Sequence, residues 1–88
     1  MQHVQWEANA KEKFDLILAK IPVFLRPIAA NKVAKKAEDL VGKDNRLEVI
    51  EKDVVDAFFL ETPFGFHGPM KMDMEAIGID YTKYGYSK

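Results

Sequence analysis

Hydrophobic residues recur at helical spacing in three stretches of this sequence. In residues 7–20, Phe14, Ile17 and Leu18 fall on one side and charged residues on the other. The stripe of residues 27–41 is rich in alanine, which allows a neighbouring helix to approach closely. Residues 52–60 repeat the pattern with larger side chains. The pattern therefore predicts three helices around one core made of Phe14, Ile17, Leu18, Phe24, Val33, Ala37, Leu40, Val54 and Phe58.

Breaking residues predict where these helices begin and end. Pro22 lacks a backbone donor and restricts the residue before it, so the first helix should stop near residue 20. Pro27 suits a first helical turn, and Gly42 suits a helix end. The β-branched pair Val49 and Ile50 predicts a short extended piece before the third helix.

The chain changes character after residue 62. Residues 63–69 contain two prolines, two glycines and two phenylalanines, which is typical of an irregular loop. A brief helical turn with Asp73 as its N-cap and Gly78 as its stop should follow. We therefore expect an all-α fold, in which residues 1–62 form a three-helix bundle and residues 63–88 an irregular aromatic and Met-rich arm packed on it. No internal repeat is evident in the sequence.

The methionines and aromatics of this arm allow two interpretations. They either fill gaps in the core, where flexible Met and flat rings pack well, or wall a hydrophobic cleft for a ligand or a protein partner.

Composition excludes most site chemistry. The chain is 48% hydrophobic and 31% charged, as in a folded domain, and it has no cysteine. His3 and His67 have no metal-ligand spacing, Ser87 is the only serine, and no phosphate-binding glycine motif is present. We expect no catalytic residues, no metal and no cofactor. The sequence predicts a cytoplasmic protein, with no signal peptide and no membrane span.

Charge is unevenly distributed along the chain. Residues 1–46 hold nine Lys or Arg against six Asp or Glu, and residues 47–88 hold four against eight. The basic half forms either a solvated helix face or an anion-binding patch. Because the sequence pI is about 6.1, nucleic-acid binding is not expected.

One part of the sequence carries a family resemblance. It consists of Trp6, the turn Ile21-Pro22-Val23-Phe24-Leu25-Arg26, the alanine-rich segment that follows, and Val49-Ile50 through Ala57. These features resemble the small C-terminal helical module of the B subunit of light-independent protochlorophyllide reductase. The chain departs from that pattern at Ala30, Ala34 and Glu51.

The resemblance implies a helical binding or accessory module near a tetrapyrrole or within a larger protein complex, without reductase activity of its own. A homodimer is compatible with so short a chain. We expect contacts where the turn of residues 24–26 meets the arm, at Phe24, Arg26, Phe64, Phe66, His67 and Met70. The order of a short helix, a longer central helix and a third helix also resembles the histone fold. That alternative predicts a dimeric nucleic-acid-binding protein.

Overall fold

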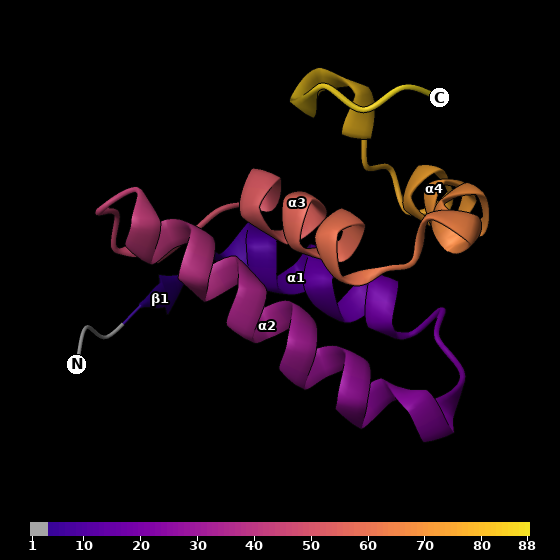
Figure 1. The fold of residues 1–88 in the computed structure, drawn as a ribbon, viewed down its shortest axis with the longest axis horizontal. Helices are drawn as coiled ribbons and strands as arrows, with labels where there is room; N and C mark the ends of the chain where they lie inside the picture. Colours follow the sequence, from indigo (N-terminus) through magenta and orange to yellow (C-terminus); the bar gives the residue numbers. More distant parts are fainter. Residues whose placement is uncertain (1–3) are drawn as a thin grey trace.

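The computed structural model describes residues 4–88, and His3 lies outside them. Four α-helices account for most of the structure, together with two short strands and three 3₁₀ turns (Figure 1). In chain order the elements are β1 (Gln5–Trp6), α1 (Ala8–Leu18), η1 (Val23–Leu25), α2 (Arg26–Lys43), β2 (Glu48–Val49), α3 (Glu51–Glu61), η2 (Phe64–Phe66), α4 (His67–Ala76) and η3 (Tyr81–Tyr84). The predicted all-α class is confirmed, and none of these helices is long and apolar enough to cross a membrane.

The first three helices form where the hydrophobic pattern predicts them. Pro22 follows the end of α1, and Pro27 lies in the first turn of α2. The end of α2 differs from the prediction, since the helix passes Gly42 and stops at Lys43. Asn45 takes the left-handed conformation after it, with φ of 56°, a conformation that Asn adopts more readily than most residues.

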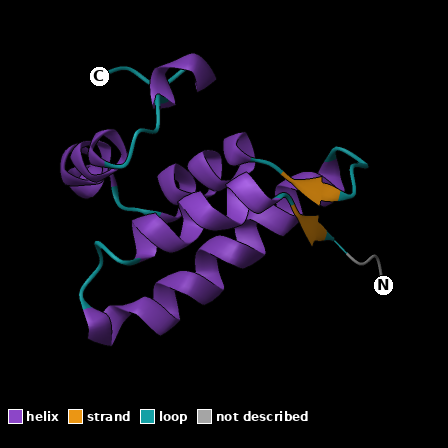
Figure 2. Cartoon of the chain, turned by 180° about the vertical axis from the view of Figure 1, so that it is seen from behind, coloured by secondary structure: helices purple, strands orange, loops and turns teal. Residues whose placement is uncertain are grey.

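The two strands form a small parallel pair (Figure 2). Gln5 aligns with Glu48 and Trp6 with Val49, so the N-terminal segment lies beside the link between α2 and α3. The extended piece predicted at Val49 is confirmed. Its partner strand was not predicted, because two residues are too few to show an alternating pattern.

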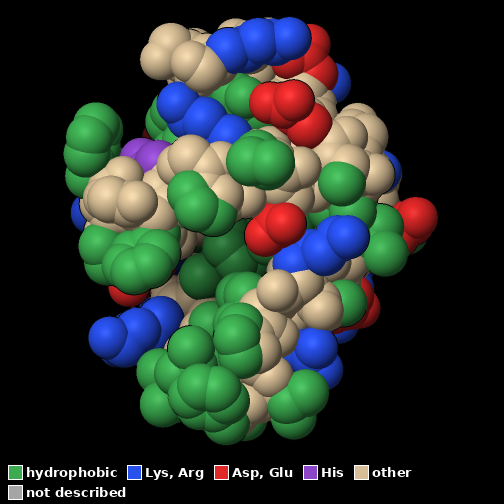
Figure 3. Space-filling model, turned by 90° about the vertical axis from the view of Figure 1, so that its right-hand side faces the viewer, with side chains coloured by type: hydrophobic (Ala, Val, Ile, Leu, Met, Phe, Trp, Pro, Cys, Tyr) green, Lys and Arg blue, Asp and Glu red, His purple; other side chains and the backbone are tan. Residues whose placement is uncertain are grey.

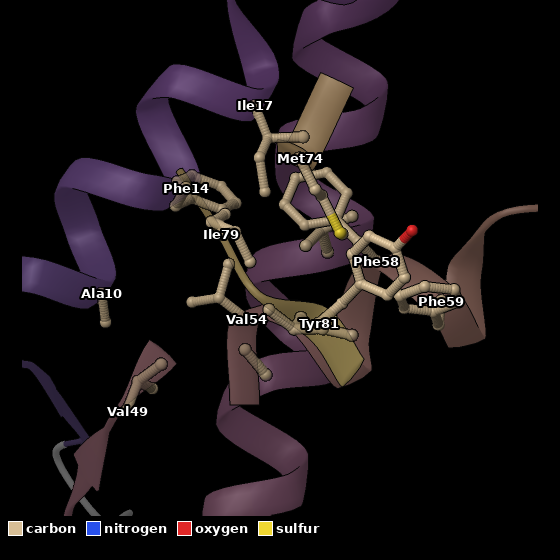
Figure 4. Packing of buried hydrophobic residues seen from close by; sticks show 14 of the residues in the cluster. Ala10, Phe14, Ile17, Val49, Val54, Phe58, Phe59, Met74, Ile79 and Tyr81 are labelled. Carbon is tan, nitrogen blue, oxygen red and sulfur yellow. The ribbon is translucent and has the colours of Figure 1, made fainter. Parts of the chain in front are cut away.

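One hydrophobic cluster joins all four helices. Phe14 and Ile17 from α1 and Phe58 from α3 are buried in it (Figure 4). Val33 and Ala37 from α2 belong to the same cluster. Most of the predicted core is confirmed, and Leu18 and Leu40 are partly buried. Phe24 was predicted to be in the core, and this is wrong, because its side chain is 79% exposed. It lies in the η1 turn.

The C-terminal arm is more regular than the sequence suggests. Helix α4 begins at His67, six residues before the Asp73 that was expected to cap it. Gly78, with φ of 83°, follows its end as predicted. Met70, Met74, Ile79 and Tyr81 are buried in the same cluster as the first three helices. The arm therefore supplies part of the core.

Candidate binding groove between two proline turns

Two turns of similar construction connect α1 with α2 and α3 with α4. In the first, Pro22 follows α1, and its carbonyl accepts a hydrogen bond from the N–H of Leu25 at 2.9 Å. The guanidinium of Arg26 folds back onto the end of α1. Its Nε donates to the carbonyls of Leu18 and Ile21, both at 2.9 Å, and its Nη2 to that of Ala19 at 3.0 Å. Arg26 thus satisfies carbonyls that a helix end leaves without partners.

The second turn repeats this arrangement 41 residues later. Pro63 follows α3, and its carbonyl accepts from the N–H of Phe66 at 2.9 Å. His67 Nε2 lies 3.1 Å from the carbonyl of Phe59 and 2.8 Å from that of Thr62. These residues stand eight and five positions before His67, as Leu18 and Ile21 stand before Arg26. The segment α1–η1–α2 is therefore repeated locally as α3–η2–α4.

A groove of about 510 Å³ lies between the two turns. Fourteen of its fifteen lining residues form seven pairs, each related by the same spacing of 41 residues. The pairs are Ile17 and Phe58, Lys20 and Glu61, Ile21 and Thr62, Pro22 and Pro63, Leu25 and Phe66, Ile28 and Pro69, and Ala29 and Met70. Asp73 is the remaining residue. Equivalent positions of the two repeats thus face a common space.

The groove and its rims are predominantly hydrophobic. Ile17 and Phe58 are buried beneath it, whereas Ile28 is 59% exposed and Phe66 64% exposed. Phe24, next to Leu25, extends the exposed apolar surface beyond the groove. Figure 3 shows hydrophobic side chains gathered on both sides of a hollow that is itself lined by hydrophobic atoms. Contiguous apolar surface of this kind usually marks a binding site in a folded protein.

Three charged residues line this apolar groove. Lys20 comes from the first repeat, whereas Glu61 and Asp73 come from the second. Lys36 Nζ lies 3.9 Å from Glu61 Oε2, a distance at the limit of an ion pair, so Glu61 is only weakly neutralised. The basic and acidic groups of the groove therefore come from different repeats.

The structure divides the expected contact residues between two surfaces. Phe66 and Met70 line the groove, and Phe24 stands exposed beside it. Phe64 and His67 line a separate, smaller hollow with Tyr86, and Phe64 is 87% exposed. Arg26 contacts carbonyls of its own chain, which is one of the roles a guanidinium at this turn can take.

Sequence reasoning missed several groove residues. Ile28, Pro69 and Phe58 were assigned to helices or to the loop without a binding role. The available signal is the shared order of a proline, a hydrophobic residue three positions later and a cationic or imidazole side chain four positions later. The two segments share few identical residues, so this order alone does not identify a repeat, which the matching hydrogen bonds reveal.

Tyrosine hydroxyls fasten the chain's last segment to carboxylates of the helices. Tyr81 donates to Glu75 at 2.5 Å, Tyr84 to Glu51 at 2.8 Å and Tyr86 to Asp56 at 2.6 Å. The ring of Tyr86 also stacks on Phe59, with centroids 3.8 Å apart.

The hydrogen bond to Glu75 and burial raise the pKa of Tyr81 to about 12. Burial and the bonded carboxylates raise the pKa values of Tyr84 and Tyr86 as well.

We expect these tyrosine–carboxylate hydrogen bonds to be lost in strong alkali. Because the folded pKa of Tyr81 exceeds its ordinary value of 10.0, its contribution to stability is complete below pH 10 and is lost as the pH rises towards about 12. Tyrosinate absorbance followed with near-ultraviolet circular dichroism checks this. In Tyr81→Phe the alkaline loss of stability should be smaller than in the wild type. An equal loss in both proteins would show that the hydrogen bond to Glu75 contributes nothing.

Among residues 4–88, no group of three or more His, Asp or Glu side chains is arranged to hold a metal ion. His67, the only imidazole in this range, directs Nε2 to main-chain carbonyls. The groove's hydrophobic lining suits non-covalent binding. No protein-family model, curated protein or solved structure matches this chain.

Proposed function

We propose that this protein is a non-catalytic binding module that docks on a protein partner through the groove between its two proline turns. The observation that carries the proposal is the apolar lining of the groove, with Ile28 and Phe66 largely exposed on its two sides. Removing such surface from water contributes roughly 25 cal/mol for each Å² of apolar area, so a complementary partner would be stabilised by it. The accessory role implied by the family resemblance agrees with this proposal.

A protein partner fits the rims better than a small ligand does. Phe24 projects beside the groove and is 79% exposed, so a molecule confined to the groove would leave it in water. Large aromatic side chains of this kind are enriched at the centres of protein interfaces.

A tetrapyrrole is the competing occupant of the same groove. Its flat ring would suit the apolar lining, and Lys20 is able to pair with one propionate. The carboxylates of Glu61 and Asp73 would repel further negative charge there. His67 would contribute no axial ligand to this groove, because it lies outside the lining and its Nε2 faces carbonyls. The two carboxylates and the lack of an axial ligand therefore favour the protein partner over a tetrapyrrole.

The histone-like alternative has less support. A nucleic-acid surface requires several phosphate contacts from Lys and Arg, and the groove contains one Lys and two carboxylates. In addition, β2 gives no support to the dimer that this alternative predicts, because it pairs with β1 of its own chain.

The proposal is tested with a synthetic amphipathic helix whose apolar face is leucine and whose polar face is glutamine, titrated by calorimetry. Ile28→Asp should weaken binding by about tenfold to a hundredfold, because a desolvated carboxylate in the interface costs a few kcal/mol. Ile28 lies in the first turn of α2, where an acidic residue is favourable, so the variant should still fold.

Leu47→Asp is the matched control. Leu47 is 62% exposed and does not line the groove, so this variant should bind as the wild type does. Equal weakening by both variants would contradict the groove assignment. A propionate-bearing porphyrin that binds wild-type protein, fails to bind Ile28→Asp and excludes the peptide would favour the tetrapyrrole instead.

A further inference from the structure

We infer that the groove's partner is an amphipathic α-helix with an acidic flank and a basic flank, the acidic flank facing Lys20 and the basic flank facing Glu61 and Asp73. The inference rests on the proposed function and adds the shape and charge of the partner to it.

The argument for a helix comes from the internal repeat. Helix α2 packs along α3, and the repeat makes α4 the equivalent of α2 and α1 the equivalent of α3. Yet α4 makes no comparable contact with α1. It has ten residues where α2 has eighteen, and it lies beyond the end of α3 (Figures 1 and 2).

The groove beside the C-terminal end of α1 is consequently not covered by a fourth helix. Ile17 of α1 is buried beneath the groove, and Lys20 and Ile21, which follow the end of α1, also line it. An external helix laid here would cover the exposed apolar lining of both repeats, such as Ile28 and Phe66, in the place that the repeat leaves without a helix. Helices pack on one another at axial distances of about 8–10 Å through interlocking side chains, and the lining of Ile, Leu, Phe and Met supplies such side chains.

The argument for opposite charges comes from the paired lining. Lys20 and Glu61 occupy equivalent positions of the two repeats and carry opposite charge. Asp73 reinforces the acidic side. Apart from Thr62 and these three charged residues, the lining is apolar, so the apolar contacts are similar for a helix placed in either direction. The charges then discriminate between partners, as charges at the edge of an interface commonly do.

Three peptides of identical leucine face test the inference by calorimetry against the wild-type protein. The first carries glutamate on one flank and lysine on the other, the second glutamate on both, and the third lysine on both. We expect the mixed peptide to bind roughly threefold to tenfold tighter than either of the others at low salt, since a semi-exposed charge pair contributes only modestly to affinity. The difference should shrink at high salt.

A charge reversal provides the matched variant. Lys20→Glu makes all three charged residues of the lining acidic, so it should move the preference to the peptide with lysine on both flanks. If the three peptides bind the wild type equally while Ile28→Asp still weakens binding, the charge assignment is wrong and the proposed function stands. If no peptide binds, the proposed function fails together with this inference. Self-association that is abolished by Ile28→Asp would identify a second copy of the chain as the occupant.

Discussion

Replacing Phe58 with alanine is expected to lower the free energy of unfolding by about 3–5 kcal/mol. Phe58 is 2% exposed in α3, and its ring lies 6.0 Å from that of Phe14 in α1. Truncation removes this contact and leaves a cavity beneath the groove, which the surrounding helices cannot fully close. A domain of this size has a total stability of the order of 5–10 kcal/mol, so much of it would be lost.

Chemical denaturation monitored by circular dichroism gives the measurement. Phe58→Leu retains most of the buried volume and should cost less than about 1.5 kcal/mol. Leu60→Ala, on the exposed side of the same helix, should change stability little, because Leu60 is 60% exposed. A loss from Phe58→Ala no larger than that from Leu60→Ala would contradict the packing of α3 described above.

The second large effect concerns Arg46, for which we expect Arg46→Met to cost about 2–4 kcal/mol. Two guanidinium nitrogens donate to the carboxylate of Asp53, at 2.6 and 3.0 Å, and the Asp53 side chain is only 4% exposed. The same carboxylate accepts from the N–H of Ile50 at 2.9 Å and so caps the start of α3. These contacts raise the pKa of Arg46 above its ordinary value, chiefly through the hydrogen bond to Asp53.

Removal of the guanidinium leaves a buried carboxylate without its charged partner. The upper part of the range applies to fully buried pairs, and the partial exposure of Arg46 reduces the expected cost. The double variant Arg46→Met/Asp53→Asn should recover part of the loss, because the amide oxygen still caps Ile50 and carries no charge. Thermal unfolding of the single and the double variant measures this recovery of stability. A double variant less stable than Arg46→Met alone would contradict the electrostatic explanation.

The helices were predictable because each depends mainly on local sequence. The spacing of Phe14 and Ile17 in α1, and of Val54 and Phe58 in α3, defines one buried face for each helix. Pro22 and Pro27 mark the boundary between α1 and α2 by covalent geometry alone.

The C-terminal arm was harder to predict because glycine and proline have different effects in different contexts. Gly68 and Pro69 indicated a loop, yet they occupy the first turn of α4, where a missing N–H costs little. His67, the first residue of α4, lies within hydrogen-bond distance of the carbonyls of Phe59 and Thr62 at the end of α3. A bond between positions eight residues apart leaves no periodic signal in the sequence.

The groove was only partly predictable for the same reason. Sequence reasoning brought the first turn and the arm together, and it included Phe66 and Met70. It placed Phe24 in the core because hydrophobic residues are usually buried, whereas Phe24 is exposed. Lys20 and Glu61 occupy equivalent positions of the two repeats. This equivalence depends on three-dimensional structure and could not be read from residue types.

Chemical-shift mapping of isotopically labelled protein with the mixed-charge peptide tests the docking groove most directly. Shifts are expected at residues of both repeats, centred on Ile17, Ile28, Phe66 and Met70, with the glutamate flank nearest Lys20. Shifts confined to the lysines of α2, which are Lys32, Lys35, Lys36 and Lys43, or to a second hollow that is lined by Trp6, Phe14 and Glu38, would contradict the account, because none of these residues lines the groove.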